Sequence, residues 1–401
     1  MIYARTNYLT ILNLFLGIAF LGLTLQLNIS AVSAQLDNTT PDPLLPNRPI
    51  KRPLNPSERS KLKQELKQLN DRAAAELEAG NEQEAFTIWY RVLRLERELG
   101  KVEEVLALGK VGEIAWNRQR QADVEIISDR LEVIEQQASL EGAINPELLS
   151  ALGQAYQQIR EINRAIAIYQ QILADDRQNK DQKATLASLD SLGQLYLAKF
   201  DYLKAAEIYE ELLKFAQQDK NYFKQGIYLR QLSEIYTKAS EPENALRIQE
   251  QLLETYLNSQ EVQRIANLKI AMASNYEALD LPQQASQTYQ EAFKMAWSLK
   301  QFGAASEALQ KLGDLYRTRD QKSAALQIYQ QLIEVEQQSY NLYGLMTAYD
   351  RIGQVYFAQN NYSAAINSFR EGMEIANSLK YQYQKDYFRD RIQQIEQQLD
   401  R

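Results

Sequence analysis

The chain has 401 residues and repeats one short pattern with a period of 40. In each copy a large residue, usually apolar, precedes a small residue, and a tyrosine follows three residues after the small one. The small residue stands at Gly153, Gly193, Ser233, Ala273, Gly313 and Gly353. A fixed period of this size is typical of a stack of similar units, each packed on its neighbours. The sequence therefore predicts a repeat array with a long recognition surface, and not one globular core.

Each repeat has the pattern of two helices. Asn145 can cap a helix and Pro146 suits its first turn. Apolar and small residues then recur at helical spacing as far as Tyr156. A polar stretch over residues 157–163 interrupts the pattern, and helical spacing resumes at Ala165. One repeat is therefore predicted to be two antiparallel helices joined by a short turn.

Small residues are expected to set the distance between the two helices. Gly153 has no side chain and lets the second helix approach, and Ala165 does the same from the other side. Aromatic residues fill the surrounding space and contribute about 1.5–3 kcal/mol each when buried. Pro242 and Pro282 are expected to open second helices. The same reciprocal pairing recurs as Gly193 with Ala205, Gly313 with Ala325, and Gly353 with Ala365.

These residues resemble the tetratricopeptide repeat, whose pattern is W-x2-L-G-x2-Y, then Ala, an aromatic residue four positions later, and Pro. Here Leu usually replaces the Trp, the Pro is missing at the matching positions, and Gln249 replaces the aromatic residue after Ala245. The period is longer than in that family and is similar to the extended repeats of kinesin light chain-like proteins. The alanine and aromatic pair stands at Ala165/Tyr169, Ala205/Tyr209, Ala285/Tyr289, Ala325/Tyr329 and Ala365/Phe369.

The resemblance covers residues 60–401 and implies an all-α fold, an α-α superhelix. We expect a right-handed solenoid of about eight helical hairpins. Counting back by the period places Ala73 and then Glu113 on the small-residue position, with Trp116 on the tyrosine position of a degenerate second repeat. The strongly polar residues 385–401 predict a capping helix at the C-terminal end.

The first residues are typical of an export signal. Residues 1–34 carry one charged side chain, Arg5, and an apolar run over residues 9–27 that ends in small residues before Gln35. We predict a signal peptide cleaved after Ala34. The run is also about long enough to cross a bilayer, so a membrane anchor remains an alternative, as does a buried helix. Residues 35–59 contain six prolines and predict an extended linker.

The composition excludes several chemistries. The chain has no Cys and no His, which rules out thiolate nucleophiles, Cys/His zinc sites and histidine triads. Its net charge of −7 argues against nucleic-acid binding. Adjacent carboxylates such as Glu103 and Glu104 diverge on a helix and cannot share a proton. We therefore predict no enzyme, no catalytic residue, no metal and no cofactor.

The resemblance to the tetratricopeptide repeat implies that the first helices line a concave groove, which is the predicted binding surface. Its residues should lie three positions before, one position after and one further turn beyond each small residue. Amides and mixed charges at such positions suit an extended peptide. The alternative is a solvated face whose charges pair with one another. The predicted partner-binding residues are Asp190, Gln194, Arg230, Glu234, Asn267, Ser274, Gln310, Asp314, Arg317, Asp350 and Gln354.

The function predicted from the sequence is an exported protein–protein interaction scaffold. It would hold a protein or peptide partner in the groove and touch a membrane only through residues 9–27, if these are retained. We expect it in a bacterial periplasm, a lumen or the extracellular space. Two alternatives are a peptide-sensing regulator that contracts on binding its ligand and a membrane-tethered assembly factor.

Aromatic residues also gather near the C-terminal end, away from the packing positions of the repeat. They allow two interpretations, an exposed adhesive patch or ordinary packing of long helices. The residues are Tyr340, Tyr343, Tyr381, Tyr383, Tyr387 and Phe388.

Overall fold

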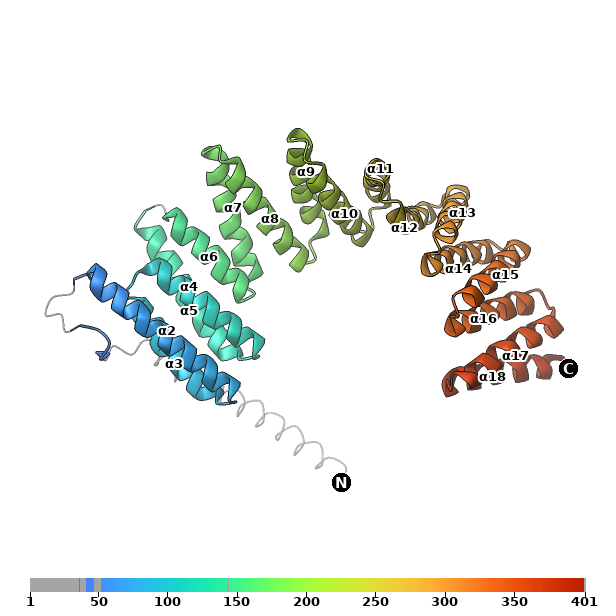
Figure 1. Cartoon of the computed structure of the whole chain (residues 1–401), viewed down its shortest axis with the longest axis horizontal. Coiled ribbons are helices and arrows are strands. Elements are labelled where there is room, and N and C mark those ends of the chain that lie inside the picture. The colour runs from blue at the N-terminus through green and yellow to red at the C-terminus, as the bar shows by residue number, and fades with distance from the viewer. Residues whose placement is uncertain (1–35, 37–40, 47–51, 143, 400–401) are drawn as a thin grey trace, which may run out of the picture. The chain divides into compact units, whose positions relative to one another are not determined.

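A computed structural model describes residues 36, 41–46, 52–142 and 144–399, and within these residues no strand is present. The chain divides after Asp201 into two compact units, which we call unit 1 and unit 2. The long helices of unit 1 are α2 (Pro56–Glu78), α3 (Glu82–Glu96), α4 (Lys101–Asn117), α5 (Gln121–Leu140), α6 (Pro146–Gln158), α7 (Ile162–Gln178) and α8 (Gln182–Ala198) (Figure 1).

Unit 2 continues the alternation of first and second helices. A short 3₁₀ turn, η1 (Val262–Arg264), precedes α12. The prediction of an all-helical fold built from tandem hairpins is confirmed. The helices of unit 2 are α9 (Tyr202–Gln218), α10 (Tyr222–Lys238), α11 (Pro242–Asn258), α12 (Ile265–Ala278), α13 (Pro282–Ser298), α14 (Phe302–Thr318), α15 (Lys322–Gln338), α16 (Leu342–Ala358), α17 (Tyr362–Ser378) and α18 (Gln382–Leu399).

The turns between helices recur every 20 residues. At Lys300 the helix end is closed by two hydrogen bonds: its N–H donates to the Trp297 carbonyl, and the next N–H donates to Ala296. This pattern requires a left-handed residue, a position that glycine usually takes. None of the twelve regular turns uses glycine; the left-handed residues are Arg160, Lys180, Phe200, Lys220, Ser240, Gln260, Asp280, Lys300, Asp320, Tyr340, Asn360 and Lys380.

Glycine at one of these turns should therefore stabilise unit 1. Lys180 is exposed and has φ 56°, a conformation that costs a residue with a β-carbon about 1–2 kcal/mol. We expect Lys180→Gly to raise the free energy of unfolding by about 0.5–1 kcal/mol, after the larger chain entropy of glycine is subtracted. Gln171→Gly, at an exposed position inside α7, should lower it by a similar amount. Urea unfolding measures both, and a loss of stability in Lys180→Gly would contradict the assignment of strain.

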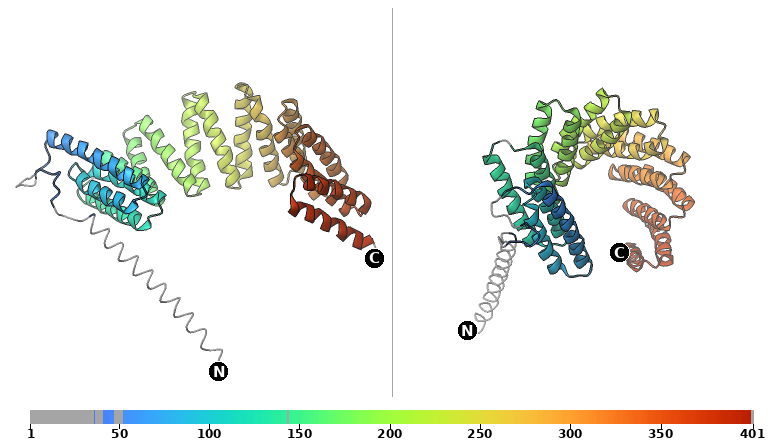
Figure 2. Two further views of the ribbon diagram at one scale, coloured as in Figure 1. Left: turned by 60° about the horizontal axis from the view of Figure 1, so that its bottom comes forward. Right: turned by 60° about the vertical axis from the view of Figure 1, so that its left-hand side comes forward.

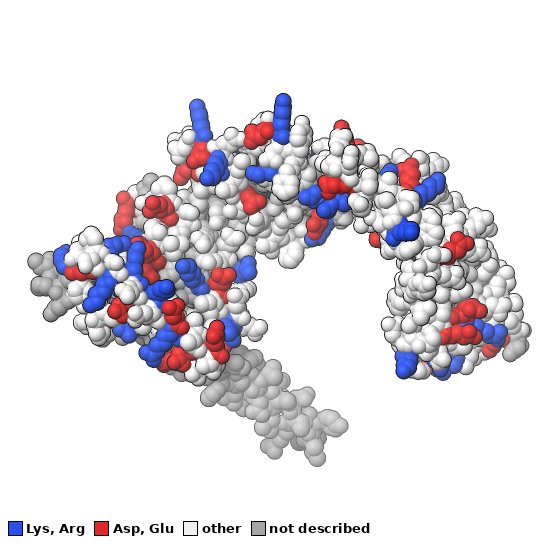
Figure 3. Space-filling model, in the orientation of Figure 1, with Lys and Arg blue, Asp and Glu red and all other residues white. Residues whose placement is uncertain are grey.

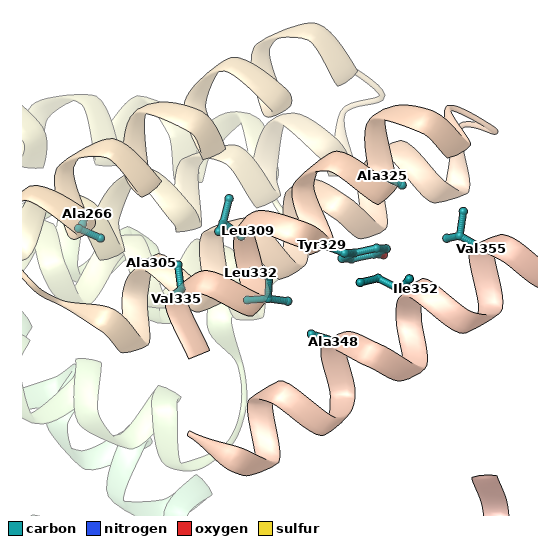
Figure 4. Packing of buried hydrophobic residues seen from close by; sticks show 11 residues of the cluster. Ala266, Ala305, Leu309, Ala325, Tyr329, Leu332, Val335, Ala348, Ile352 and Val355 are labelled. Carbon is teal, nitrogen blue, oxygen red and sulfur yellow. The ribbon is translucent and has the colours of Figure 1, made fainter. Parts of the chain in front are cut away.

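Aromatic rings lie directly on the repeated glycines. A β-carbon built on Gly153 would stand 3.2 Å from the Tyr169 ring, and one built on Gly353 would stand 2.6 Å from Phe369. The expected close approach is thus confirmed, and the ring that lies against the glycine comes from the position four residues after the paired alanine. Figure 4 shows Tyr329 in this place, between Ala325 and the residues of α16.

The tyrosines of the first helices also make polar contacts between hairpins. In Tyr196, Tyr236 and Tyr316 the hydroxyl meets a residue of the preceding second helix, 26 positions earlier in the chain. Gln170 donates to Tyr196 at 2.9 Å. Tyr236 donates to Glu210 at 2.7 Å. Because one end of each ring is buried and the other is hydrogen-bonded, these tyrosines fix one repeat against the next.

One hairpin replaces the glycine and the ring with a buried polar group. Ser233 stands at the glycine position and Gln249 at the aromatic position. The Gln249 amide is fully buried, donates to the Ser233 hydroxyl at 3.1 Å and accepts from Asn275 of α12 at 2.9 Å. The replacement of the aromatic residue by Gln249 is therefore compensated by Ser233 and Asn275, which bond to one N–H and to the oxygen of its buried amide.

The register predicted for the second repeat is wrong by one residue. Glu113 is exposed, and the small residue that faces the second helix is Gly112, whose β-carbon would meet Ile127 and Ile159. Trp116, expected at the packing position, is 47% exposed. The left-handed residue of this turn is Gln119, one position before the residue 120 that the 20-residue spacing requires. Helix α5 is longer than the helices of later repeats, and the regular spacing is restored at Arg160.

Part of the predicted linker packs against the first hairpin. Leu54 is buried with residues of α2 and α3, and Leu44 and Leu45 pack beside it. Asp42 forms an ion pair with Arg91 at 2.7 Å. These leucines bury apolar surface against the first hairpin, and this burial stabilises the packed segment despite its prolines. The described residues of this segment therefore differ from the expected spacer.

The two ends of the helical array differ slightly from their predicted bounds. α2 begins at Pro56, earlier than residue 60, because Asn55 and Glu58 form a capping box there. α18 begins at Gln382 and covers α17 with Phe388, Ile392 and Ile395, as a capping helix should. The predicted signal peptide or anchor at residues 1–34 lies outside the described residues. No helix in the described part of the chain has the length and apolar character needed to span a bilayer.

Candidate functional site

The predicted groove residues meet best in a cleft of unit 2 between α10 and α12. The second helix α11 forms its floor, and its volume is about 450 Å³. Three predicted residues line it: Arg230 and Glu234 from α10, and Asn267 from α12. Gln249 and Leu252 contribute the floor.

Several polar groups of this cleft remain available. Among the described residues, neither Arg230 nor Asn267 has a hydrogen-bond or ion-pair partner. Glu234 is paired with Lys238 at 2.7 Å, and both side chains are about half exposed. Gln249 is fully buried, and its amide oxygen and one N–H bond to Asn275 and Ser233, so it belongs to the floor and is not a group available to a ligand. The cleft, which we call the α10–α12 cleft, therefore presents guanidinium and amide groups above a partly apolar floor.

Other predicted residues of unit 2 are bound to the hairpins instead. The Ser274 hydroxyl lies 2.9 Å from the Tyr289 hydroxyl. Asp314 accepts from Tyr329 at 2.7 Å and lies 3.4 Å from Arg317. Gln310 donates to the Ser306 hydroxyl. At these positions the side chains pair with other residues of the protein, as the alternative to a binding groove predicts.

The last predicted pair lies next to the capping helix. Asp350 accepts from the Tyr387 hydroxyl at 3.0 Å and from the Gln354 amide at 2.9 Å. Burial raises the pKa of Asp350, while these two hydrogen bonds act in the opposite direction. Gln354 also lines a small cleft of about 150 Å³ with Phe357.

The remaining predicted residues belong to unit 1. Asp190 and Gln194 lie on α8, where the Gln194 amide donates to the Asp190 carboxylate at 2.8 Å. They are one helical turn apart, so their mutual hydrogen bond is a local one.

Unit 1 has a second cleft, between α2 and α4 above α3, of about 600 Å³. Lys63, Lys67 and Lys110 line it around the Glu96 carboxyl. Burial and the nearby Glu103 carboxylate raise the pKa of Glu96 to about 7, against the opposing effect of Lys63 and Lys110. The cleft therefore combines a basic rim with a carboxyl group whose charge changes near neutral pH.

Sequence reasoning missed the unit 1 cleft. The groove rule takes the residues three positions before and one position after each small residue. Applied to Ala73, it gives Asn70 and Ala74, and both line this cleft. On the α4 side the same rule, applied to Glu113, gives Lys110 and Ile114, which also line the cleft. Over the face seen in Figure 3, Lys and Arg are interspersed with Asp and Glu.

Three segments of the chain match family models of the tetratricopeptide repeat. They are residues 148–182, 307–339 and 347–379. These segments correspond to α6–α7, α14–α15 and α16–α17. No curated protein sequence matches the chain.

Solved structures with a similar arrangement are only distantly related. Aspartyl phosphate phosphatase F from Bacillus subtilis is 17% identical, covers 71% of this chain and 78% of its own, and has a TM-score of 0.43. BtubC from P. vanneervenii is 18% identical, with 55% and 92% covered and a TM-score of 0.40. A Rap protein complexed with competence and sporulation factor is 14% identical, with 84% and 99% covered and a TM-score of 0.33.

Proposed function

We propose that the chain is a protein-interaction scaffold, as its three segments that match the tetratricopeptide repeat suggest. Its α10–α12 cleft binds an extended peptide segment of a protein partner. The segment carries an acidic side chain that pairs with Arg230. Its backbone is held by the exposed Asn267 amide. The observation that carries this proposal is the pair of unpartnered polar side chains, Arg230 and Asn267, on either side of one open cleft.

The chemistry of these groups fits an extended chain better than a compact ligand. A peptide in extended form presents N–H and C=O groups that need partners. An asparagine amide can donate to and accept from such a backbone, which makes it suitable for sequence-independent contacts. A guanidinium pairs with a carboxylate through two parallel hydrogen bonds, which adds specificity at one position. The partly apolar floor, with Leu252 and Leu268, takes a side chain between these contacts.

The test is selection from a display library of random peptides against the full chain. Enriched peptides should contain a recurring Asp or Glu. Arg230→Glu should weaken their binding at least about tenfold, since it removes a charge-assisted pair and adds repulsion. Fluorescence anisotropy of a labelled peptide measures the affinity.

Arg370→Glu provides the matched control. It makes the same change of charge on the exposed surface of α17, where Arg370 has only a long ion pair of 3.8 Å with Glu396. Binding should stay at the wild-type level, because an exposed pair of this length contributes little. Equal affinity in wild type and Arg230→Glu would remove the cleft proposal.

We also propose that the chain is exported and acts outside the cytoplasmic membrane. The support is the apolar run at residues 9–27 followed by small residues before Gln35. Mass spectrometry of the protein from its native compartment tests this. A mature chain that begins at Gln35 supports export with cleavage, and a full-length chain in the cytoplasm contradicts it. A full-length chain in the membrane fraction assigns residues 9–27 to an anchor.

A further inference from the structure

The turns of unit 2 alternate between two opposite edges of its stack of helices (Figure 2). On one edge each turn joins a second helix to the next first helix. Contacts link successive turns there: Gln301 donates to the Gln263 carbonyl at 2.8 Å, and the Tyr343 and Tyr381 rings lie 6.3 Å apart. This edge, which we call the aromatic edge, contains the turns centred on Lys220, Gln260, Lys300, Tyr340 and Lys380.

Large rings stand exposed along the aromatic edge. Tyr222 and Phe223 are 73% and 78% exposed, and Tyr340 and Tyr383 are 90% and 81% exposed. Trp297 is also exposed. On the opposite edge, the described residues at the turns of Ser240, Asp280, Asp320 and Asn360 include no exposed large apolar side chain, whereas the turn of the same kind that precedes α9 has exposed Phe200 and Leu203. Among the turns that lie wholly within unit 2, the exposed rings are therefore found on the aromatic edge.

The two edges also differ in charge at equivalent positions. The left-handed residues of the aromatic edge include Lys220, Lys300 and Lys380, whereas those of the opposite edge include Asp280 and Asp320. All of these positions share the same backbone conformation, so turn geometry does not explain the difference. Among the turns that lie wholly within unit 2, an exposed ring and a left-handed lysine occur together on the aromatic edge.

We propose that the aromatic edge docks on a bilayer surface that contains anionic phospholipids. Tyrosine and tryptophan rings favour the interfacial region, where the ring meets apolar chains and the polar end meets water. Lysines extend to the phosphates of the headgroups and bind an anionic surface. A protein partner is the competing occupant, but protein interfaces are enriched in these rings and depleted in lysine. The lysines therefore favour the lipid surface. The inference concerns a different surface from the peptide cleft and does not depend on it.

Trp297 can report this contact without a label. In the full chain with Trp116→Phe, the other tryptophan is Trp89, which is buried in α3. Vesicles of equal parts phosphatidylglycerol and brominated phosphatidylcholine should quench Trp297, because bromine quenches only nearby rings. Vesicles of brominated phosphatidylcholine alone should give a partition coefficient more than about 100-fold lower, since each lysine near an anionic surface contributes about 1 kcal/mol.

Charge reversal on the aromatic edge is the decisive variant. Lys220→Glu, Lys300→Glu and Lys380→Glu together should abolish quenching by the anionic vesicles. All three residues are exposed turn residues, so the fold should be kept, and circular dichroism checks this. The matched control makes the same charge change on the opposite edge, with Lys238→Glu, Arg319→Glu and Lys322→Glu, and should be quenched as strongly as the parent.

Three outcomes overturn the proposal. One is the absence of Trp297 quenching by anionic vesicles. Another is an equal loss of quenching in the two triple variants, which would show only a dependence on net charge. The third is a lipid-independent change in Trp297 emission with protein concentration, which would assign the rings to a second copy of the chain.

Discussion

Gly313→Ala is expected to lower the local stability of unit 2 by about 2–4 kcal/mol. The new β-carbon would stand 2.7 Å from Cδ1 and 2.9 Å from Cζ of the Tyr329 ring. The ring cannot move aside freely, because its hydroxyl donates to Asp314 at 2.7 Å and the side chain is fully buried. The variant must therefore overpack the hairpin or break this hydrogen bond.

The same helix supplies the control. Gly303 is the second residue of α14, and a β-carbon added there would meet no neighbouring atom within 4 Å. Gly303→Ala should therefore raise stability by up to about 1 kcal/mol, because alanine favours the helix. Amide hydrogen exchange in α14 and α15 is the suitable measurement, since a repeat array need not unfold as one unit. Equal effects of the two substitutions would contradict the packing described for Tyr329.

Gln249→Leu is expected to lower the stability of the α10–α12 region by about 1–3 kcal/mol. The reason is that the substitution leaves Asn275 without its hydrogen-bond acceptor. Asn275 is buried and donates its amide N–H to Gln249, and in the variant this donor has no partner. Ser233 is half buried and can bond to water instead.

A double variant separates the lost hydrogen bond from simple loss of packing. Gln249→Leu with Asn275→Leu removes both polar partners and should recover most of the stability, because leucine already stands at the equivalent positions Leu195 and Leu315. Urea unfolding with hydrogen exchange in α10 to α12 gives the coupling energy. Strictly additive losses would show that the Gln249–Asn275 hydrogen bond does not explain this departure from the repeat pattern.

The repeat pattern was sufficient to predict the hairpins. Gly153, Ala165 and the first-turn prolines Pro242 and Pro282 occupy the structural positions expected for them. These residues could be interpreted because their conformational properties are local: glycine permits close approach, and proline suits a first turn. The second repeat was misplaced because it is one residue shorter than the period before Gln119 and one residue longer after it. A search with a fixed period cannot detect two such changes that cancel.

The candidate site could be predicted only in part. The register placed Arg230, Glu234 and Asn267 around one cleft, since residues on one helical face stay together. It could not show that Asp314 and Asp350 are engaged by Tyr329 and Tyr387, because those contacts join residues 15 and 37 positions apart on different helices.

The sequence indicated only the C-terminal part of the aromatic edge. The cluster near the C-terminal end was open to two interpretations, and the structure divides it between them. Phe388 of α18 is buried against α17, while Tyr340 and Tyr383 are exposed. Tyr222 lies far from them in the sequence and joins them only because every second turn returns to the same edge.

A charge swap tests the central claim, that the α10–α12 cleft recognises its partner through Arg230. A selected peptide is made in two forms, one with its acidic residue and one with lysine at that position. Wild type should bind the acidic form, and Arg230→Glu should bind the lysine form, so that the preference reverses. If both proteins bind the two peptides with the same preference, Arg230 does not contact the partner and the account of this cleft is wrong.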